Sequence, residues 1–262
     1  MISPNAHVDP TAKIGSDVTI HPFAFVDADT VIGDGCTIMP YASVIGGTTL
    51  GKNVKVYQGA IVGADPQDFR WKGEKTHCFI GDNTIIREHV IINRGIRAEG
   101  GTKVGPDSFV MADSHIGHDS VIVGRCVIGN GVTIAGDVFI DEGTILSSNA
   151  VAHERSRIGK YVLIKGGTRI SSNVPPFTIM AHNPVAYYGV NSVVMAKHAG
   201  FDEKLVDDAA KAYRHIYQTA TSVFNALRRI EDDIDDSPVR REILDFVRSC
   251  NLKLAGHNVE LD

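Results

Sequence analysis

The sequence lacks several features that would place it in common classes of protein. No stretch approaches the ~18 consecutive apolar residues of a membrane-spanning helix. The first ten residues, MISPNAHVDP, have neither the basic start nor the apolar run of a secretory signal. The net charge is −5 with both signs interspersed. We therefore expect no membrane insertion and no nucleic-acid partner.

Cysteine is also scarce. The four cysteines, Cys36, Cys78, Cys126 and Cys250, are scattered without the close spacing of a metal site. Cys36 and Cys126 fall in a small-residue register described below, which favours buried, unreactive thiols. Together with the missing signal, this pattern predicts a cytoplasmic protein with reduced cysteines.

What the sequence does have is a period of six residues. Every sixth residue from Ile2 to Ile170 gives 29 positions, and all but four of them are Ile, Val or Leu. Four residues after each of these aliphatic anchors stands a small or β-branched residue. A period of six fits neither an α-helix nor an alternating strand, but it fits a short strand followed by a tight turn. Three such units close a triangular coil. The sequence therefore predicts an all-β left-handed parallel β-helix of hexapeptide repeats over residues 1–176.

Two segments interrupt the anchors. Asp68 and Glu74 break the column in a segment near residues 63–79, and Ala98 breaks it near residues 93–103. The phase of the repeat is unchanged after each, which predicts loops that project from intact coils. Loops on a rigid scaffold are where binding residues gather, although an oligomer contact is the alternative role.

The pattern changes near the C-terminus. Pro175 and Pro176 are predicted to stop strand addition, and residues 177–200 then read as a linker. The spacing of apolar residues over 201–262 predicts a C-terminal α-helical domain. Its helices are capped by Asp202 and Ser237, and a helix between these two carries the apolar residues Val223, Leu227, Ile230 and Ile234.

Three segments carry a family resemblance: PQD (66–68), IREHVIINRG (86–95) and MADSHIGHD (111–119). With them the chain resembles, nearly end to end, the acyl-[acyl-carrier-protein]–UDP-N-acetylglucosamine O-acyltransferases, hexapeptide-repeat enzymes that begin lipid A synthesis. The resemblance implies transfer of a (3-hydroxy)fatty acyl chain from acyl carrier protein to the 3-hydroxyl of UDP-N-acetylglucosamine. It also implies no cofactor, and a homotrimer with active sites in clefts between adjacent β-helices.

The resemblance also assigns residues. His118 is the expected general base, Asp119 orients its imidazole, and the backbone N–H of Gly136 faces the developing oxyanion. A positioned base contributes ~10²–10⁴-fold to such a reaction, and an oxyanion donor a further ~10²–10³-fold. The expected substrate-binding residues are Asp68, Arg70, His115, Asp137, His153, Glu154 and His198.

The chain departs from the family pattern at several of these positions. Asp137 and Glu154 stand where the family has histidine and glutamine, Arg155 replaces an aromatic residue, and the basic segment before the first helix keeps only Lys197 and His198. Two carboxylates beside His118 would favour the protonated imidazole and would repel a nucleotide diphosphate. These changes predict an altered acceptor or weakened activity.

Other functions remain open from the sequence. One alternative is a related hexapeptide acyltransferase with a different nucleotide-sugar acceptor or acyl donor, and another is a sugar-nucleotide-binding paralogue with little turnover. A zinc site would need His115 and His118 to be joined by a further ligand such as His153, because zinc takes three or four ligands. Arg155, Arg157 and Lys160 form a basic cluster that is either a patch for an acidic carrier protein or a solvated face.

Overall fold

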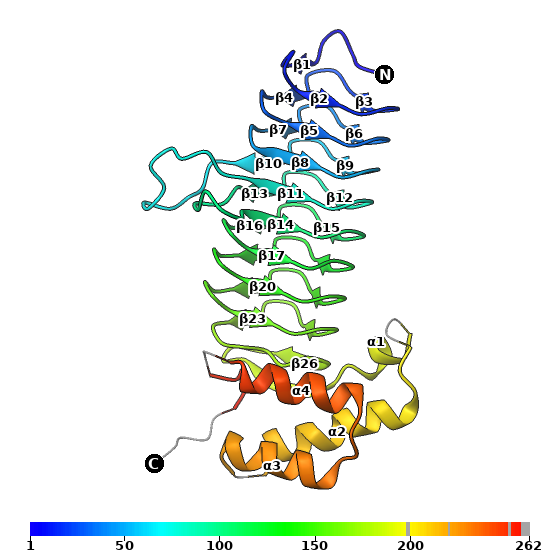
Figure 1. Cartoon of the computed structure of the whole chain (residues 1–262), viewed down its shortest axis with the longest axis vertical. Coiled ribbons are helices and arrows are strands. Elements are labelled where there is room, and N and C mark those ends of the chain that lie inside the picture. Colours follow the sequence, from blue (N-terminus) through cyan, green and yellow to red (C-terminus); the bar gives the residue numbers. More distant parts are fainter. Residues whose placement is uncertain (198–199, 220, 251–252, 258–262) are drawn as a thin grey trace.

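A computed structural model describes residues 1–197, 200–219, 221–250 and 253–257 of the chain. Most of it winds into a left-handed parallel β-helix, and a group of helices closes the C-terminal end (Figure 1). Within the described residues the strands form three sheets, one for each side of the coil. The β-helix predicted from the six-residue period is confirmed. In the same residues, no helix combines the length and apolar character that crossing a membrane requires.

The strands are short, and most of them end on an aliphatic anchor. The first sheet contains β1 (His7–Val8), β4 (Phe25–Val26), β7 (Ser43–Val44), β10 (Ile61–Ala64), β13 (Ile91–Asn93), β16 (His115–Ile116), β19 (Thr133–Ile134), β22 (Val151–Ala152) and β25 (Arg169–Ile170). The second contains β2 (Lys13–Ile14), β5 (Val31–Ile32), β8 (Thr48–Leu50), β11 (Cys78–Ile80), β14 (Thr102–Val104), β17 (Val121–Ile122), β20 (Phe139–Ile140) and β23 (Arg157–Ile158). The third contains β3 (Thr19–Ile20), β6 (Thr37–Ile38), β9 (Lys55–Val56), β12 (Ile85–Ile86), β15 (Phe109–Val110), β18 (Val127–Ile128), β21 (Ile145–Leu146), β24 (Leu163–Ile164), β26 (Thr178–Ala181) and β27 (Ala186–Val190).

The anchors fill the interior of the coil. Val44, Ile116 and Ile128 are fully buried, like the anchors above and below them. Each such side chain contributes ~1.5–3 kcal/mol when it leaves water. Because each coil pairs only with its neighbours, the stability of the stack is close to a sum over coils.

The two loops leave the register intact because their inserted lengths are multiples of six. Val44 pairs with Val62, 18 positions later, whereas Val62 pairs with Ile92, 30 positions later. In the second sheet Ile80 pairs with Val104, 24 positions later. The insertions therefore add twelve and six residues, which explains why the sequence period shows no break. The longer loop stands out from the coil between β10 and β11 (Figure 1).

The corners of the coil place residues in the left-handed backbone region. Asp119, Asp137 and Arg155 occupy the same corner of three successive coils, with φ values of 56°, 59° and 64°. Aspartate tolerates this region, whereas a bulky residue such as arginine is found there less often. Because neighbouring coils lie about 4.8 Å apart, the three side chains form a vertical row.

The β-helix continues past the two prolines, so the prediction that they stop strand addition is wrong. Met180 in β26 pairs in parallel with Ile164, only 16 positions earlier, and Val174 forms a bridge with Ile158. The last coil is therefore two residues shorter than the others. Pro175 and Pro176 lie at its corner, after the bridging Val174, where the missing N–H breaks no ladder bond. The segment predicted as a linker instead holds β26 and β27.

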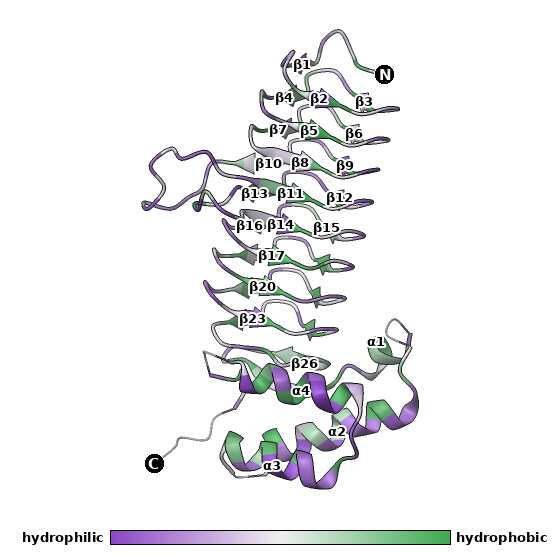
Figure 2. Cartoon of the chain, in the orientation of Figure 1, coloured by the Kyte–Doolittle hydropathy of each residue, from purple (hydrophilic) through white to green (hydrophobic). Residues whose placement is uncertain are grey.

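The C-terminal helices begin close to their predicted caps. They are α1 (Ser192–Lys197), α2 (Glu203–Tyr217), α3 (Val223–Asp233) and α4 (Pro238–Arg248). The side chains of Asp202 and Ser237 accept hydrogen bonds from the first turns of α2 and α4, as expected of N-caps. Figure 2 shows hydrophobic and hydrophilic residues on opposite faces of these helices. The short helix α1 was not predicted.

Contacts between charged and aromatic groups hold the helices on the end of the β-helix. Arg157 lies over the ring of Phe246 and donates to the Ser249 hydroxyl at 2.7 Å. Lys160 pairs with Glu242 at 2.9 Å. Arg157 of β23 and Lys160 in the following turn therefore attach the β-helix to α4 and to Ser249 just after it. Of the three residues in the predicted basic cluster, only Arg155 is exposed.

Candidate active site

His118 lies at a corner of the coil, between β16 and β17. Its side chain is only 9% exposed. The ring contacts a carboxylate on each side: Nδ1 lies 2.9 Å from Oδ2 of Asp119, and Nε2 lies 3.2 Å from Oδ2 of Asp68. Asp68 comes from the first loop, so the loop and the coil meet at this imidazole.

Asp119 is fixed by the second loop. Its backbone N–H donates to Oγ1 of Thr102 at 2.9 Å, and its Oδ2 accepts from the N–H of Ile96 at 3.0 Å. Gly95 lies so close that a methyl group there would stand 2.7 Å from Oδ1 of Asp119. The carboxylate is almost wholly buried and therefore holds the His118 ring in one orientation.

Gly136 lies one coil further along, against the ring of His118. A methyl group at Gly136 would stand 3.0 Å from Cδ2 of the imidazole and nearer still to Nε2 and Cε1. Among the residues that the structure describes, the Gly136 N–H donates to no acceptor. A free N–H beside a histidine is the geometry of an oxyanion donor next to a base.

Asp68 is held by Arg70 of the same loop. The Arg70 backbone N–H and its Nη2 each donate to the Asp68 carboxylate at 2.7 Å. These hydrogen bonds hold the pKa of Asp68 well below its ordinary value of 3.8, so the carboxylate is ionised at neutral pH. Arg70 also reaches Oε1 of Glu154 at 3.4 Å.

The surroundings of His115 favour its neutral form. Burial, with a smaller contribution from the charge of His118, lowers the pKa of His115 below the ordinary 6.5. Its Nε2 lies 2.8 Å from Oδ1 of Asn93, whose amide nitrogen donates to the Asp65 carbonyl. The Asn93 oxygen thus faces the ring, Nε2 carries the proton, and Nδ1 is left as an acceptor.

The structure pairs Asp137 and Glu154, which were predicted to stand near His118, with arginines. Asp137 forms a hydrogen-bonded ion pair with Arg97 of the second loop, and Glu154 pairs with Arg70 and Arg155. The carboxylates in contact with His118 are Asp119 and Asp68 instead. The charges of the two substituted residues are therefore offset by arginines.

Of the two remaining predicted residues, the structure describes one. His153 is exposed and contacts Arg169, with 3.3 Å between Nε2 and Nη2. His198 lies outside the described residues.

Sequence reasoning missed Arg97. This residue bridges two successive coils, because its Nε lies 3.5 Å from Oδ1 of Asp119 while Nη2 bonds Asp137. The only available signal was its position in a projecting loop. Its partners are 22 and 40 positions away, and no local pattern links them.

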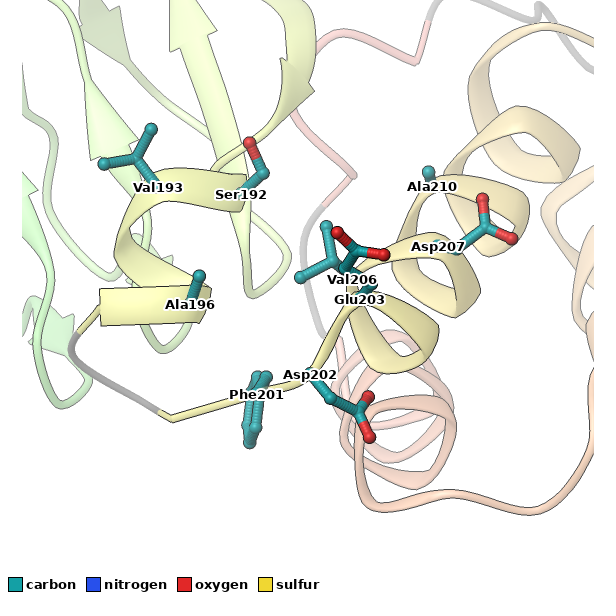
Figure 3. A pocket seen from close by; sticks show the side chains of 9 residues that line it. All are labelled: Ser192, Val193, Ala196, Phe201, Asp202, Glu203, Val206, Asp207 and Ala210. Atoms are coloured by element: carbon teal, nitrogen blue, oxygen red, sulfur yellow. The ribbon is translucent and has the colours of Figure 1, made fainter.

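A hollow lies between α1 and α2, and none of the described candidate-site residues lines it (Figure 3). Its volume is about 620 Å³, and its walls combine apolar residues such as Phe201 and Val206 with the carboxylates of Asp202, Glu203 and Asp207. In the described part of the chain, no three His, Cys, Asp or Glu side chains are grouped to hold a metal ion.

The fold and the site define a class of protein. The hexapeptide β-helix places the chain among the hexapeptide-repeat proteins, and the buried histidine–aspartate pair sets its candidate site at one corner of the coil. Comparisons with known proteins narrow this class. The model for the second domain of UDP-N-acetylglucosamine O-acyltransferases matches residues 173–254, and the model for the GMPPB C-terminal domain matches residues 2–99.

Relatives match over the whole length. The chain is 42% identical to the acyl-[acyl-carrier-protein]–UDP-N-acetylglucosamine O-acyltransferase of Xanthomonas oryzae, and 36% identical to that of Xylella fastidiosa, with 97% of each chain covered. Among solved structures, the UDP-N-acetylglucosamine acyltransferase of Bacteroides fragilis superposes with a TM-score of 0.94 at 40% identity, covering 97% of this chain and 99% of that one. The chain belongs to the acyl-[acyl-carrier-protein]–UDP-N-acetylglucosamine O-acyltransferase family.

Proposed function

We propose that this protein transfers a (3-hydroxy)fatty acyl chain from acyl carrier protein to the 3-hydroxyl of UDP-N-acetylglucosamine, the first step of lipid A biosynthesis. Family membership supports the reaction. The observation that carries the mechanism is the buried His118 ring, held at Nδ1 by Asp119 and packed against Gly136, whose N–H donates to no acceptor among the described residues.

The reaction begins when the sugar hydroxyl enters between Nε2 of His118 and the carboxylate of Asp68. His118 accepts the hydroxyl proton as the oxygen attacks the thioester carbonyl, and the negative charge on the carbonyl oxygen is stabilised by the Gly136 N–H. When the tetrahedral intermediate collapses, the carbon–sulfur bond breaks and the leaving thiolate takes the proton from His118. Asp119 keeps the imidazole in the tautomer that carries its proton on Nδ1.

Substrate binding falls to the residues around this centre. Asp68, fixed by Arg70, is placed to accept a hydrogen bond from a sugar hydroxyl or amide. Nδ1 of the neutral His115 is a second acceptor. Asp137 and Glu154 act through the arginines they bind, and His153 directly precedes Glu154 in the chain.

The active form is proposed to be a homotrimer in the cytoplasm. An apolar groove of about 630 Å³ runs over β8, β11, β14 and β17, where Phe79 and Val123 are more than a third exposed. An exposed apolar face of this kind favours contact with another copy of the chain. The four free cysteines agree with a reducing compartment. Light scattering on the purified chain tests the trimer, and a monomer at micromolar concentration would contradict it.

The experiment is a turnover assay by mass spectrometry, with acyl carrier protein thioesters and a panel of UDP-sugars. We expect O-acylated UDP-N-acetylglucosamine, and a loss of at least ~10²-fold in His118→Ala. His89→Ala is the matched control, because His89 also pairs with an aspartate, Asp113 at 3.3 Å, but is exposed. Acylation only of a different UDP-sugar, or only with an acetyl donor, would favour a different hexapeptide acyltransferase. Binding without any product would favour a non-catalytic relative.

A further inference from the structure

Arg97 of the second loop reaches across two successive coils of the β-helix beside the candidate active site. Its Nε lies 3.5 Å from Oδ1 of Asp119, and its Nη2 is hydrogen-bonded to Asp137. Asp119 directly follows His118, whereas Asp137 directly follows Gly136 on the next coil. One guanidinium group therefore connects the coil that carries the proposed base to the coil that carries the proposed oxyanion donor.

The two oxygens of the Asp119 carboxylate differ in their partners. Oδ2 accepts a hydrogen bond from the Ile96 N–H and lies 2.9 Å from Nδ1 of His118. Oδ1 is buried and has no hydrogen-bond partner among the described residues. A buried charged oxygen in this state is costly unless an opposite charge stands near it. The structure places the Arg97 guanidinium beside this oxygen, so Arg97 stabilises the ionised carboxylate.

The charged groups around the His118 ring come from its own coil, from both loops and from the coils that follow. The carboxylates are Asp68, Asp119, Asp137 and Glu154, and the cations that pair with them are Arg70, Arg97 and Arg155. His115 also interacts with the ring, and its surroundings favour its neutral form. Four carboxylates against three arginines favour the protonated imidazole. Loss of Arg97 would double this excess of negative charge.

We propose that Arg97 is a positioning residue for the acyl transfer and acts on His118 through Asp119. The inference rests on the proposed function and gives the side chain two effects. Its charge offsets the charge of Asp119, so a larger fraction of the imidazole is unprotonated and able to accept the hydroxyl proton. Its bond to Asp137 holds the second loop across both coils and fixes the separation between the ring and the Gly136 N–H. Neither effect requires Arg97 to touch a substrate.

The pH dependence of acyl transfer in Arg97→Gln tests the effect of the charge. On the acidic side, the rate profile should move to higher pH by about 0.5–1.5 units, because a unit charge one carboxylate away from the ring shifts its proton uptake by this amount. At a fixed acidic pH this shift makes kcat about 3- to 30-fold lower. KM for both substrates should be unchanged.

Two further variants separate charge from geometry. Arg97→Lys keeps the charge, so its profile should return to that of the parent. Its rate on the plateau should stay lower, because an ammonium group lacks the rigid fork of donors with which a guanidinium bridges two carboxylates. Arg125→Gln is the matched control and should change neither the profile nor the rate. Arg125 is 55% exposed against 57% for Arg97, and it likewise pairs with a carboxylate of the next coil, Glu142.

NMR titration of the histidine Cε1–H signals in the full chain is a second readout that needs no turnover. The signal of His118, identified by its loss in His118→Ala, should titrate at higher pH in Arg97→Gln and as in the parent in Arg125→Gln. An unchanged His118 titration, or a raised KM with an unmoved rate profile, would overturn the proposal, since Arg97 would then bind a substrate or only hold the loop. If the signal moves but the parent transfers no acyl group, the proposed function alone fails.

Discussion

Replacement of Gly136 by alanine tests the arrangement of base and oxyanion donor. The added methyl group would stand 3.0 Å from Cδ2 of His118 and nearer to Nε2 and Cε1, whereas non-bonded carbons settle at about 3.5–4.0 Å. The ring must therefore move by about 1 Å. The backbone of Gly136 is not in the left-handed region, so an alanine there keeps the N–H and the coil.

A displacement of 1 Å at a reacting group costs about 10²-fold in rate. We expect kcat/KM for acyl transfer to fall by that factor in Gly136→Ala, with a melting temperature within a few degrees of the parent. Gly46→Ala on an early coil is the control, since its methyl group meets the Ala28 carbonyl at 3.1 Å but lies far along the stack from His118. Full activity in Gly136→Ala would refute the reasoning, because the base would then tolerate a shift that its role forbids.

Three further predictions concern stability. Ile128→Asp buries a charge in mid-stack and should abolish the cooperative melting transition, whereas the exposed Thr133→Asp should not; a folded Ile128→Asp protein would contradict the account of the core. Tyr213→Phe leaves the Pro176 carbonyl without its donor, which costs about 1–3 kcal/mol and lowers the melting temperature at about 2–4 °C per kcal/mol. The pKa of His115 is lowered in the folded protein, so the unfolded chain takes up a proton more readily and the free energy of unfolding falls as pH drops below the ordinary value of 6.5. The urea midpoint of the parent should therefore be lower at the more acidic of two pH values. In His115→Gln this difference between the two midpoints should be smaller.

The sequence was sufficient to predict the β-helix because its constraints are local. Each coil needs an anchor such as Ile128 inward and a small residue at the corner, and both repeat at fixed spacing. The caps of α2 and α4 were predictable for the same reason. The final coil was not predictable. It is two residues shorter than the others, which places Pro175 at a corner where no N–H is needed. The sequence pattern does not show this shortening.

The charges of the candidate site were only partly predictable. His118 and Asp119 are neighbours, so their pairing followed from position and resemblance. The partners of Asp137 and Glu154 could not be predicted in this way. Arg97 and Arg70 lie 40 and 84 positions away in the sequence, and the two loops bring them to these carboxylates. Two carboxylates that looked repulsive in the sequence are each paired with an arginine in the folded protein.

The pH dependence of acyl transfer in His118→Ala tests the catalytic proposal most directly. With His118 as the base, kcat/KM of the parent should fall tenfold per pH unit on the acidic side, as one group takes up a proton. The variant should keep a residual rate at least ~10²-fold lower that does not change over the same range. A variant that retains the acidic fall, or an activity close to that of the parent, would show that another group removes the hydroxyl proton.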